Sequence, residues 1–274
     1  MSRATAALLC SGWLACAAPA RAHGDLHDQI ESLTAALRED PNSAELYHKR
    51  GELERAHGDH AAALADYRRA QRLDPALHVV RLSRGRTLLE SGKAHAAERA
   101  LAAFLQRSGE HAAARLLHAR ALASLGRRAE AEAAYARALA QVADPLPDLF
   151  LERARNLALG GKAAAALAVL EDGLRRLGPL VTLQDAALVL ELDLGRLDAA
   201  LARLEAMLAT APRKEALLAR KAAILERAGR REQAGAVRAQ ALAALDALPP
   251  PKRALAATQK LRAELLGQGR GTRH

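Results

Sequence analysis

The sequence predicts an all-α protein that is built from one helical hairpin repeated along the chain. Three observations support this fold class. Half of the 274 residues are apolar, while only 2% are aromatic. Most of the apolar residues are alanine and leucine, which favour helices, and residues that favour strands are scarce. The chain also repeats itself with a period close to 34 residues.

The repeat is marked by a glycine that recurs six times, at spacings of 34, 34, 35, 34 and 34 residues, and an alanine always stands five residues after it. The glycine lies between two amphipathic stretches, where a chain reversal favours a left-handed residue that glycine adopts without strain. The alanine is small enough to let the two helices of a hairpin approach closely. The predicted structural residues of the repeat are Gly58, Gly92, Gly126, Gly161, Gly195, Gly229, Ala63, Ala97, Ala131, Ala166, Ala200 and Ala234.

Two more columns keep the same period. The residue seven positions before each glycine is small in five of six copies, beginning with Gly51 and Gly85. The residue four positions after each alanine is large and apolar in five of six copies, beginning with Tyr67 and Leu101. A proline stops the second helix in two copies, first at Pro75. This arrangement resembles the tetratricopeptide-repeat (TPR) family, whose period is also about 34 residues.

The resemblance implies a right-handed α-solenoid of about six TPR repeats with a capping helix at each end. The repeats are placed at 44–77, 78–111, 112–145, 147–180, 181–214 and 215–248, with one inserted residue near Leu146. Four copies depart from the pattern: Glu54 and Glu191 replace an apolar residue, Phe104 fills a small column, and Arg238 fills the large apolar one. These departures weaken single contacts and leave the fold prediction unchanged.

Both ends of the repeat array are predicted to be capped, because an uncovered end would expose apolar surface. At the N-terminal side, segment 23–43 contains an amphipathic helix over 25–39. At the C-terminal side, segment 249–266 begins with three prolines and continues as a capping helix, and residues 267–274 are predicted to be a disordered tail. The inward residues of the C-terminal helix are predicted to be Leu255, Leu261 and Leu265.

Residues 1–22 are predicted to be a cleavable signal peptide. A single arginine precedes an apolar run that is too short to span a membrane, and Ala20 and Ala22 are the small residues that a signal peptidase reads. Cleavage after Ala22 would make the chain periplasmic or secreted. Both cysteines, Cys10 and Cys16, lie in this segment, so cleavage leaves no thiol. A lipid anchor at Cys16 is an alternative, but Trp13 and Leu14 fit poorly the small and aliphatic residues expected before a lipidated cysteine.

Composition and motifs favour a binding protein over an enzyme. No glycine-rich phosphate loop, nucleophile elbow or zinc-type histidine pair is present, so we predict no catalytic residue and no cofactor. The net charge of +10 raises nucleic acid as an alternative partner, but the signal peptide and the few aromatic residues for base stacking weigh against it. A copper site is a further alternative, because cleavage would make His23 the terminal residue, able to chelate Cu(II) together with His27.

The first helix of each TPR repeat lines the concave surface, and repeat positions 5 and 9 face it. In the middle three repeats these positions hold one leucine and one arginine each, which predicts a groove for a peptide or a partner helix. The groove residues are Leu82, Leu116, Leu151, Arg86, Arg120 and Arg155. Leucines would supply apolar contact, and guanidinium groups would hold carboxylates or carbonyl oxygens by paired hydrogen bonds.

The alternative interpretation of these residues is packing. The leucines would then fill the space between neighbouring helices, and Arg86 and Arg155 would pair with Glu90 and Glu152 of their own helices. Arg120 has no carboxylate at such a spacing and is the predicted anchor of a partner.

The predicted function is a non-enzymatic interaction scaffold of the bacterial cell envelope that binds another protein or peptide. A docking subunit of an envelope export or maturation complex is the alternative, by analogy with the fold.

Overall fold

The structure is a computed structural model that describes residues 18–268. Within this range the chain forms fifteen α-helices and no β-strand, which confirms the predicted all-α fold. The helices divide into two compact units: unit 1 ends at Leu125 and unit 2 begins at Gly126. None of the helices in the described range is long and apolar enough to span a bilayer.

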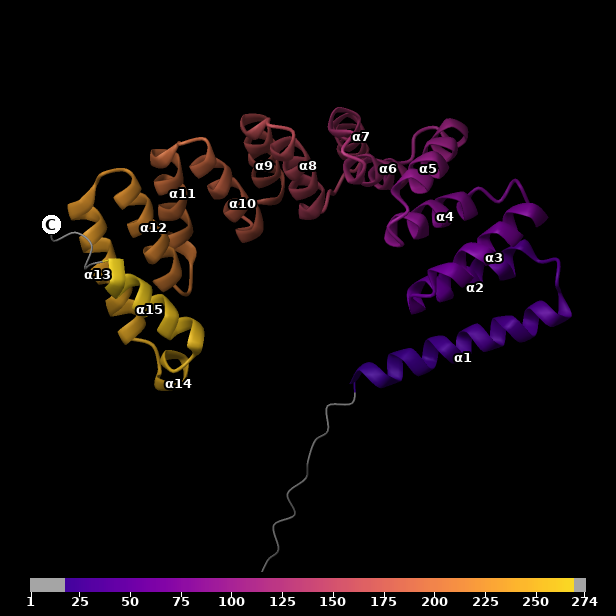
Figure 1. The fold of residues 1–274 in the computed structure, drawn as a ribbon, viewed down its shortest axis with the longest axis horizontal. Helices are drawn as coiled ribbons and strands as arrows, with labels where there is room; N and C mark the ends of the chain where they lie inside the picture. The colour runs from indigo at the N-terminus through magenta and orange to yellow at the C-terminus, as the bar shows by residue number, and fades with distance from the viewer. Residues whose placement is uncertain (1–17, 269–274) are drawn as a thin grey trace, which may run out of the picture. The chain divides into compact units, whose positions relative to one another are not determined.

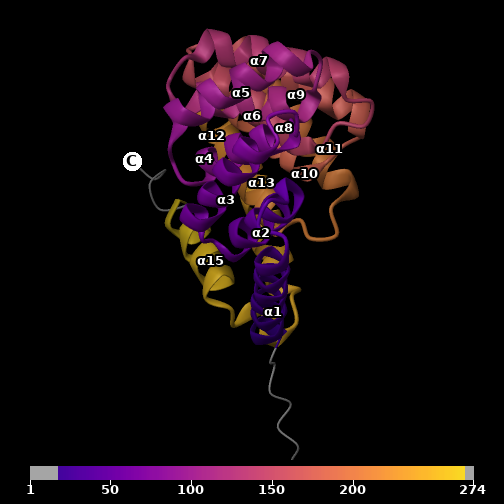
Figure 2. The same cartoon turned by 90° about the vertical axis from the view of Figure 1, so that its right-hand side faces the viewer.

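Unit 1 contains α1 (Ala18–Glu39), α2 (Ala44–His57), α3 (His60–Leu73), α4 (Val79–Glu90), α5 (Ala94–Ser108) and α6 (Ala112–Ser124) (Figure 1). Consecutive helices pack against each other, so that α2 and α3 form one hairpin, α4 and α5 form the next, and α6 follows α5. Helix α1 lies beside α2 in Figure 1 and also in the turned view of Figure 2.

Helix α1 covers the first hairpin through its contact with α2. It begins at Ala18, seven residues before the predicted helix over 25–39, and both end at Glu39. The helix therefore runs through the predicted cleavage position after Ala22. Most of the predicted signal peptide, including Cys10 and Cys16, lies at positions 1–17, outside the described residues.

Unit 2 contains the remaining helices, which again pair as hairpins. The helices are α7 (Arg128–Gln141), α8 (Pro147–Leu159), α9 (Ala163–Leu177), α10 (Val181–Asp193), α11 (Leu197–Thr210), α12 (Glu215–Arg227), α13 (Arg231–Asp246), α14 (Pro250–Arg253) and α15 (Ala256–Gln268). Three hairpins, α8–α9, α10–α11 and α12–α13, follow one another, α7 packs against α8, and α15 packs against α13.

The C-terminal cap differs from the single predicted helix. Prolines begin a one-turn helix, α14, which ends at Arg253, and α15 starts only at Ala256. Leu255 lies in the break and is 53% exposed, so its predicted inward position is wrong. Leu265 is buried, and Leu261 packs against the same cluster. Helix α15 continues to Gln268, so the first two residues of the predicted tail are helical; positions 269–274 lie outside the described residues.

The six regularly spaced glycines close the hairpins with left-handed backbone angles. Their φ values run from +69° at Gly195 to +93° at Gly58. Apart from the glycine and its two chain neighbours, no heavy atom of the described residues lies within 4 Å of a Cβ added at any of these six positions. Conformation rather than crowding therefore selects glycine there, because other residues adopt positive φ only with strain.

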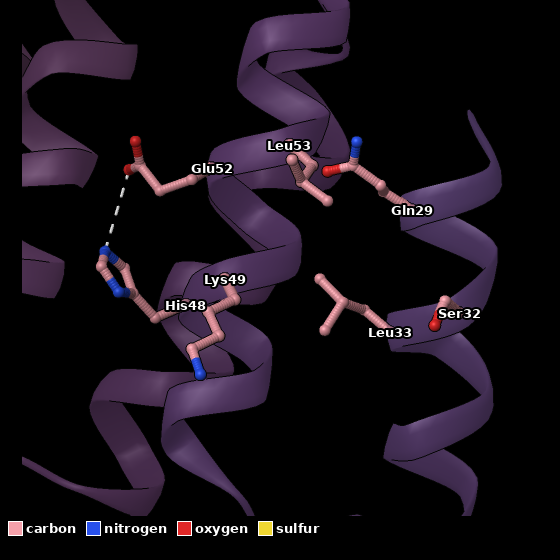
Figure 3. A pocket seen from close by; sticks show the side chains of 7 residues that line it. All are labelled: Gln29, Ser32, Leu33, His48, Lys49, Glu52 and Leu53. Atoms are coloured by element: carbon pink, nitrogen blue, oxygen red, sulfur yellow. Dashed lines mark ion pairs between the residues drawn. The ribbon is translucent and has the colours of Figure 1, made fainter. Parts of the chain in front are cut away.

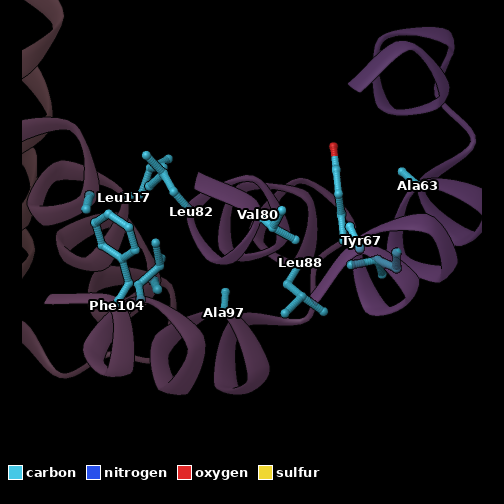
Figure 4. Close-up of a cluster of buried hydrophobic side chains, with 13 residues drawn as sticks. Ala63, Tyr67, Val80, Leu82, Leu88, Ala97, Phe104 and Leu117 are labelled. Carbon is cyan, nitrogen blue, oxygen red and sulfur yellow. The ribbon is translucent and has the colours of Figure 1, made fainter. Parts of the chain in front are cut away.

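The small and large columns meet inside each hairpin. All six repeat alanines have 0% exposure. A Cβ added at Gly51 on α2 would lie 2.7 Å from a ring carbon of Tyr67 on α3, and one added at Gly85 would lie 2.7 Å from Leu101. Tyr67 and Ala63 belong to the core cluster of unit 1, which Figure 4 shows. The other three columns thus form a packing pattern, in which small residues make room for large ones on the partner helix.

Two of the residues that depart from the repeat pattern, Phe104 and Glu191, are accommodated in the core by their neighbours. Phe104, in a column that is usually small, is 4% exposed and joins the core of unit 1. Glu191, in a column that is usually apolar, is 4% exposed on α10 and receives two hydrogen bonds from Arg203 of α11, at 2.7 and 3.0 Å. Burial of a carboxylate is costly unless a cation pairs with it, and Arg203 supplies that cation.

Candidate functional site

The first-helix face of unit 1 is the surface formed by α2, α4 and α6, the first helices of three successive hairpins. Helix α4 contacts both α2 and α6. Repeat positions 5 and 9 of these helices hold His48, Glu52, Leu82, Arg86, Leu116 and Arg120. Four of the six predicted groove residues therefore belong to this face.

A hydrogen-bonded network centred on Glu52 joins α2 to α3 and, through His48, to α4. The Tyr67 hydroxyl of α3 donates to Glu52 Oε1 at 2.7 Å, and Arg55 donates to Oε2 at 3.3 Å. His48 Nε2 lies 3.8 Å from Glu52 Oε1 and 3.0 Å from the Oγ of Ser83 on α4. The dashed line in Figure 3 marks the contact between His48 and Glu52. The network thus ties the first hairpin to the second.

The surroundings shift the pKa values within this network. Burial lowers the pKa of His48, although the Glu52 carboxylate acts in the opposite direction. Burial by itself would raise the pKa of Glu52, but hydrogen bonds from Ser83 and Tyr67 and the charge of Arg55 outweigh burial and lower it. Burial and the bond to Glu52 raise the pKa of Tyr67. At neutral pH the network therefore contains a neutral imidazole, a carboxylate and a protonated phenol.

An open cavity of about 470 Å³ lies between α1 and α2, next to this network. Leu33 of α1 and Leu53 of α2 supply its apolar surface, and Figure 3 shows both side chains between the two helices. The other lining residues are Gln29, Ser32, His48, Lys49 and Glu52. Leucine side chains beside the exposed Lys49 suit an apolar side chain of a partner that also carries polar groups.

Arg86 is half-buried on α4 and lacks the partner that the packing interpretation assigns to it. Glu90, one helical turn further on, pairs instead with Arg55 of α2 at 3.2 Å and lies 3.9 Å from His60. Within residues 18–268, Arg86 has no hydrogen bond or ion pair. Its guanidinium group therefore keeps its donors for a ligand or solvent.

The other three predicted groove residues of unit 1 behave differently. Leu82 is 9% exposed and belongs to the core cluster seen in Figure 4, so its predicted place in a groove is wrong. It is buried because the hairpin α4–α5 and α6 enclose its position on α4. Leu116 is half-buried on α6. Arg120 is half-buried too, and it takes part in an interaction within the protein.

The last two predicted groove residues, Leu151 and Arg155, lie on α8 of unit 2. Leu151 is half-buried and Arg155 is exposed. Arg155 does not pair with Glu152, which accepts a hydrogen bond from the Tyr135 hydroxyl at 3.3 Å. In the part of the chain that the structure describes, Arg155 has no ion pair. The intrahelical pairs of the packing interpretation are thus absent for both Arg86 and Arg155.

The predicted copper alternative gains no geometric support. The His23 side chain lies outside the described side chains, and His27 Nε2 lies 3.2 Å from Glu31 of the same helix. No group of three or more histidine, cysteine, aspartate or glutamate side chains is arranged to hold a metal ion in the described residues.

Two features of the site are not evident from the repeat pattern. The cavity depends on how α1 packs on α2, and no residue spacing within the repeats encodes that. The Glu52–Tyr67 bond does leave a signal: Tyr67 fills the large apolar column with a side chain that carries a hydroxyl, and a buried hydroxyl needs a partner.

Comparisons with known proteins agree with this architecture. Residues 20–78 and 82–146 match the family model described as tetratricopeptide repeat. No curated protein matches the sequence. A crystal structure of PilW, described as a widely conserved type IV pilus biogenesis factor, is similar with a TM-score of 0.58 and 22% identity, over 69% of this chain and 88% of that chain.

Two further solved structures have the same fold. A tetratricopeptide repeat protein from Parabacteroides merdae ATCC 43184 has a TM-score of 0.57 and 18% identity, over 90% of this chain and 94% of that one. A MamA structure from Desulfovibrio magneticus RS-1 has a TM-score of 0.53 and 17% identity, over 57% and 87% of the two chains. At these identities the likeness concerns the fold alone.

Proposed function

This chain belongs to the tetratricopeptide-repeat family, and we propose that it is a non-enzymatic scaffold that binds a peptide or a partner helix on the first-helix face of unit 1. The family's fold is that of protein-interaction modules. The observation that carries the proposal is Arg86, a half-buried guanidinium group on this face whose expected partner, Glu90, is held by Arg55. A carboxylate or a carbonyl oxygen of a bound segment would satisfy it by paired hydrogen bonds.

The neighbouring cavity supports the same proposal with a second kind of contact. An apolar side chain of the bound segment would enter between Leu33 and Leu53 and remove their exposed surface from water. Lys49, which is exposed and lines the cavity, would favour a nearby acidic residue. The expected ligand is therefore a segment with an apolar anchor and at least one carboxylate.

Selection of peptides from a displayed library against the full chain tests the proposal. We expect the selected peptides to combine an apolar anchor with an acidic residue. Arg86→Ala should weaken their binding about tenfold or more, because a hydrogen bond to a charged group contributes about 1.5–3 kcal/mol. Leu33→Ser should weaken it as well. Titration calorimetry with one selected peptide measures both effects.

Arg137→Ala is the matched control. Arg137 is exposed on α7 in unit 2, and within the described chain it has neither a hydrogen bond nor an ion pair. Its replacement removes the same charge at a distance in sequence from the first-helix face. Equal affinity of the Arg86→Ala and Arg137→Ala variants would show that peptides bind elsewhere. Arg120 is a weaker choice for this test, because its replacement also removes an interaction within the protein.

We also propose that the scaffold acts in the bacterial cell envelope, as a periplasmic or secreted protein. The support is the apolar segment before Ala20-Arg21-Ala22. Mass analysis of the N-terminus after export should find a chain that begins at His23. A lipid-modified Cys16 would assign the protein to the membrane surface instead, and an intact N-terminus in the cytoplasm would contradict the proposal.

A further inference from the structure

A separate cluster of arginines lies where α4 and α5 meet α3, on a different side of α4 from Arg86. A cavity of about 180 Å³ is lined there by Arg81 and Arg84 of α4, Arg107 of α5 and Gln71 of α3. Ala100 and Ala103 of α5 complete part of its wall, and their short side chains keep it open. Three cations thus converge on one small hollow.

Arg84 differs from the basic residues at the same position of other repeats, because in the described part of the chain those residues lie close to a carboxylate and Arg84 does not. The same position of the first helix is basic in four other repeats, and in each of them a carboxylate lies close by. The pairs are Arg50 with Asp66 at 2.7 Å, His118 with Glu98 at 3.6 Å, Arg153 with Glu132 at 2.7 Å, and Lys221 with Glu205 at 3.1 Å. Within residues 18–268, Arg84 has no ion pair and no hydrogen bond.

The two other arginines also lack carboxylates. Arg81 donates to the backbone oxygen of Pro75 at 3.1 Å and lies 3.1 Å from the ring of His78. Arg107 is exposed in the last turn of α5 and, among the described residues, makes neither a hydrogen bond nor an ion pair. No acidic residue lines the cavity.

Nearby carboxylates are engaged elsewhere, so they do not neutralise the cluster. Residues 60–108 contain nine arginines and lysines but only four acidic residues. Asp66 pairs with Arg50, Glu90 pairs with Arg55, and Glu98 lies next to His118. The fourth acidic residue, Asp74, accepts a hydrogen bond from Ala76 N at 2.8 Å. Within residues 18–268, none of these carboxylates forms an ion pair with Arg81, Arg84 or Arg107, so the hollow carries an excess of positive charge.

We propose that Arg81, Arg84 and Arg107 form a binding site for a phosphate group. Guanidinium groups match the oxygens of phosphate with paired hydrogen bonds, and a ligand with nearly two negative charges balances more of three cations than a single carboxylate does. Gln71 and Gln106 line the same cavity and add amide donors. The phosphate group can come from inorganic phosphate or from the phosphomonoester headgroup of a lipid.

Two binding measurements on the full chain test the site. Titration calorimetry with inorganic phosphate measures the free anion, and co-sedimentation with phosphatidylcholine vesicles, with and without phosphatidic acid, measures the headgroup. We expect binding in at least one of them, with Arg84→Gln weakening it about tenfold or more. Arg107→Gln should do the same, and this exposed residue can be replaced without disturbing the core. Circular dichroism confirms that each variant is folded.

Arg137→Gln is the control for loss of one positive charge, and it should bind like the original chain. Binding to inorganic phosphate identifies the free anion as ligand, and binding only to vesicles with phosphatidic acid identifies the headgroup. The proposal is overturned if the original chain binds neither, or if Arg137→Gln weakens binding as much as Arg84→Gln. Because Arg86→Ala leaves this hollow unchanged, the test is independent of peptide binding on the first-helix face.

Discussion

Unit 1 and unit 2 consist of the same kind of hairpin, yet different side chains join their helices. In unit 1, Glu52 links α2 to α3 through the Tyr67 hydroxyl, and His48 lies within hydrogen-bond distance of Ser83 on α4. In unit 2, α10 and α11 are joined by the buried Arg203–Glu191 pair, which also includes Glu171 of α9. All histidines between positions 18 and 268 belong to unit 1.

The two units also differ in the side chains that cap the first turns of their helices. In unit 1, the side chains of Ser43, Asp59 and His111 accept hydrogen bonds from the first turns of α2, α3 and α6. In unit 2, no side chain caps any of the helices α7 to α13. The repeat therefore specifies where helices begin, turn and touch, while the polar bonds between and within them are chosen locally. Four predictions examine this difference.

The largest effect is expected at the buried ion pair of unit 2. Arg203→Leu leaves Glu191 buried without its cation, which should lower the free energy of unfolding by about 3–5 kcal/mol. Urea denaturation followed by circular dichroism measures the loss, and hydrogen exchange should locate it in unit 2.

The double variant Arg203→Leu/Glu191→Leu is the control for this pair. It places an apolar residue where the repeat pattern expects one and leaves no buried charge, so most of the stability should return. If Arg203→Leu alone is as stable as the original chain, Glu191 is hydrated or protonated without cost, and the proposed role of the pair is wrong.

A smaller effect is expected from an added methyl group in unit 1. In Gly51→Ala the new Cβ would lie 2.7 Å from a ring carbon of Tyr67, which the core and the bond to Glu52 hold in place. We expect a net loss of about 1–2 kcal/mol after the gain in helix propensity. Gly235→Ala in α13 is the matched control, because nothing lies within 4 Å of its Cβ. It should be neutral or stabilise unit 2, and equal losses in both variants would contradict the packing argument.

The third prediction concerns pH. The pKa of His48 is lower in the folded protein than its ordinary value of 6.5, so the unfolded chain binds more protons as the pH falls below that value. The contribution of His48 to the free energy of unfolding is then constant above this pH and decreases below it, by about 1.4 kcal/mol for each pKa unit of lowering.

Urea denaturation at about pH 7.5 and about pH 5.5 tests the sign of this effect. The loss should appear in unit 1 and should be reduced in His48→Gln, which keeps a polar group facing Ser83. Unit 2 contains no histidine between positions 126 and 268 and should show no such loss. Other histidines of unit 1 also lie near carboxylates, such as His118 near Glu98, so the His48→Gln variant decides the assignment. A rise in the stability of unit 1 on acidification that disappears in His48→Gln would show that protonated His48 is instead stabilised by Glu52.

The smallest effects are expected at the helix ends. Asp59 accepts hydrogen bonds from Ala61 N at 3.1 Å and Ala62 N at 2.9 Å, so Asp59→Ala should destabilise unit 1 by about 1 kcal/mol. Arg196 at the start of α11 has nearly the same backbone angles as Asp59, φ −82° and ψ 62° against φ −80° and ψ 75°. Arg196→Asp should therefore stabilise unit 2 by up to about 1 kcal/mol. Thermal unfolding measures both, and a loss in both variants would contradict the comparison.

Much of the fold could be predicted from residue spacing because the repeat acts locally. The positive φ of Gly58 and its five counterparts, and the full burial of Ala63 and its counterparts, agree with the roles that the spacing assigned to them. The C-terminal cap was less predictable. Leu255 fits an amphipathic helix on paper, but prolines begin a separate short helix before it and the chain breaks at that residue.

The candidate site was harder to predict, because its contacts join different helices. Helical spacing pairs Arg86 with Glu90, whereas Glu90 pairs with Arg55 of the preceding hairpin. Leu82 occupies a position that faces a groove in the repeat pattern, yet it is buried in the core of unit 1. Each outcome depends on which side chain of a neighbouring helix comes close enough, and spacing along one helix does not contain that information.

Residue spacing alone predicts the all-α class, the helical hairpin and the places where glycine turns the chain, since these follow from backbone preference and side-chain size over a few residues. Which charges are paired depends on how the helices pack. Arg84 and Arg86 have no ion pair within residues 18–268, whereas Arg50 and Arg55 do. The physical reason is that an ion pair requires two groups within about 4 Å, and packing of separate helices sets that distance.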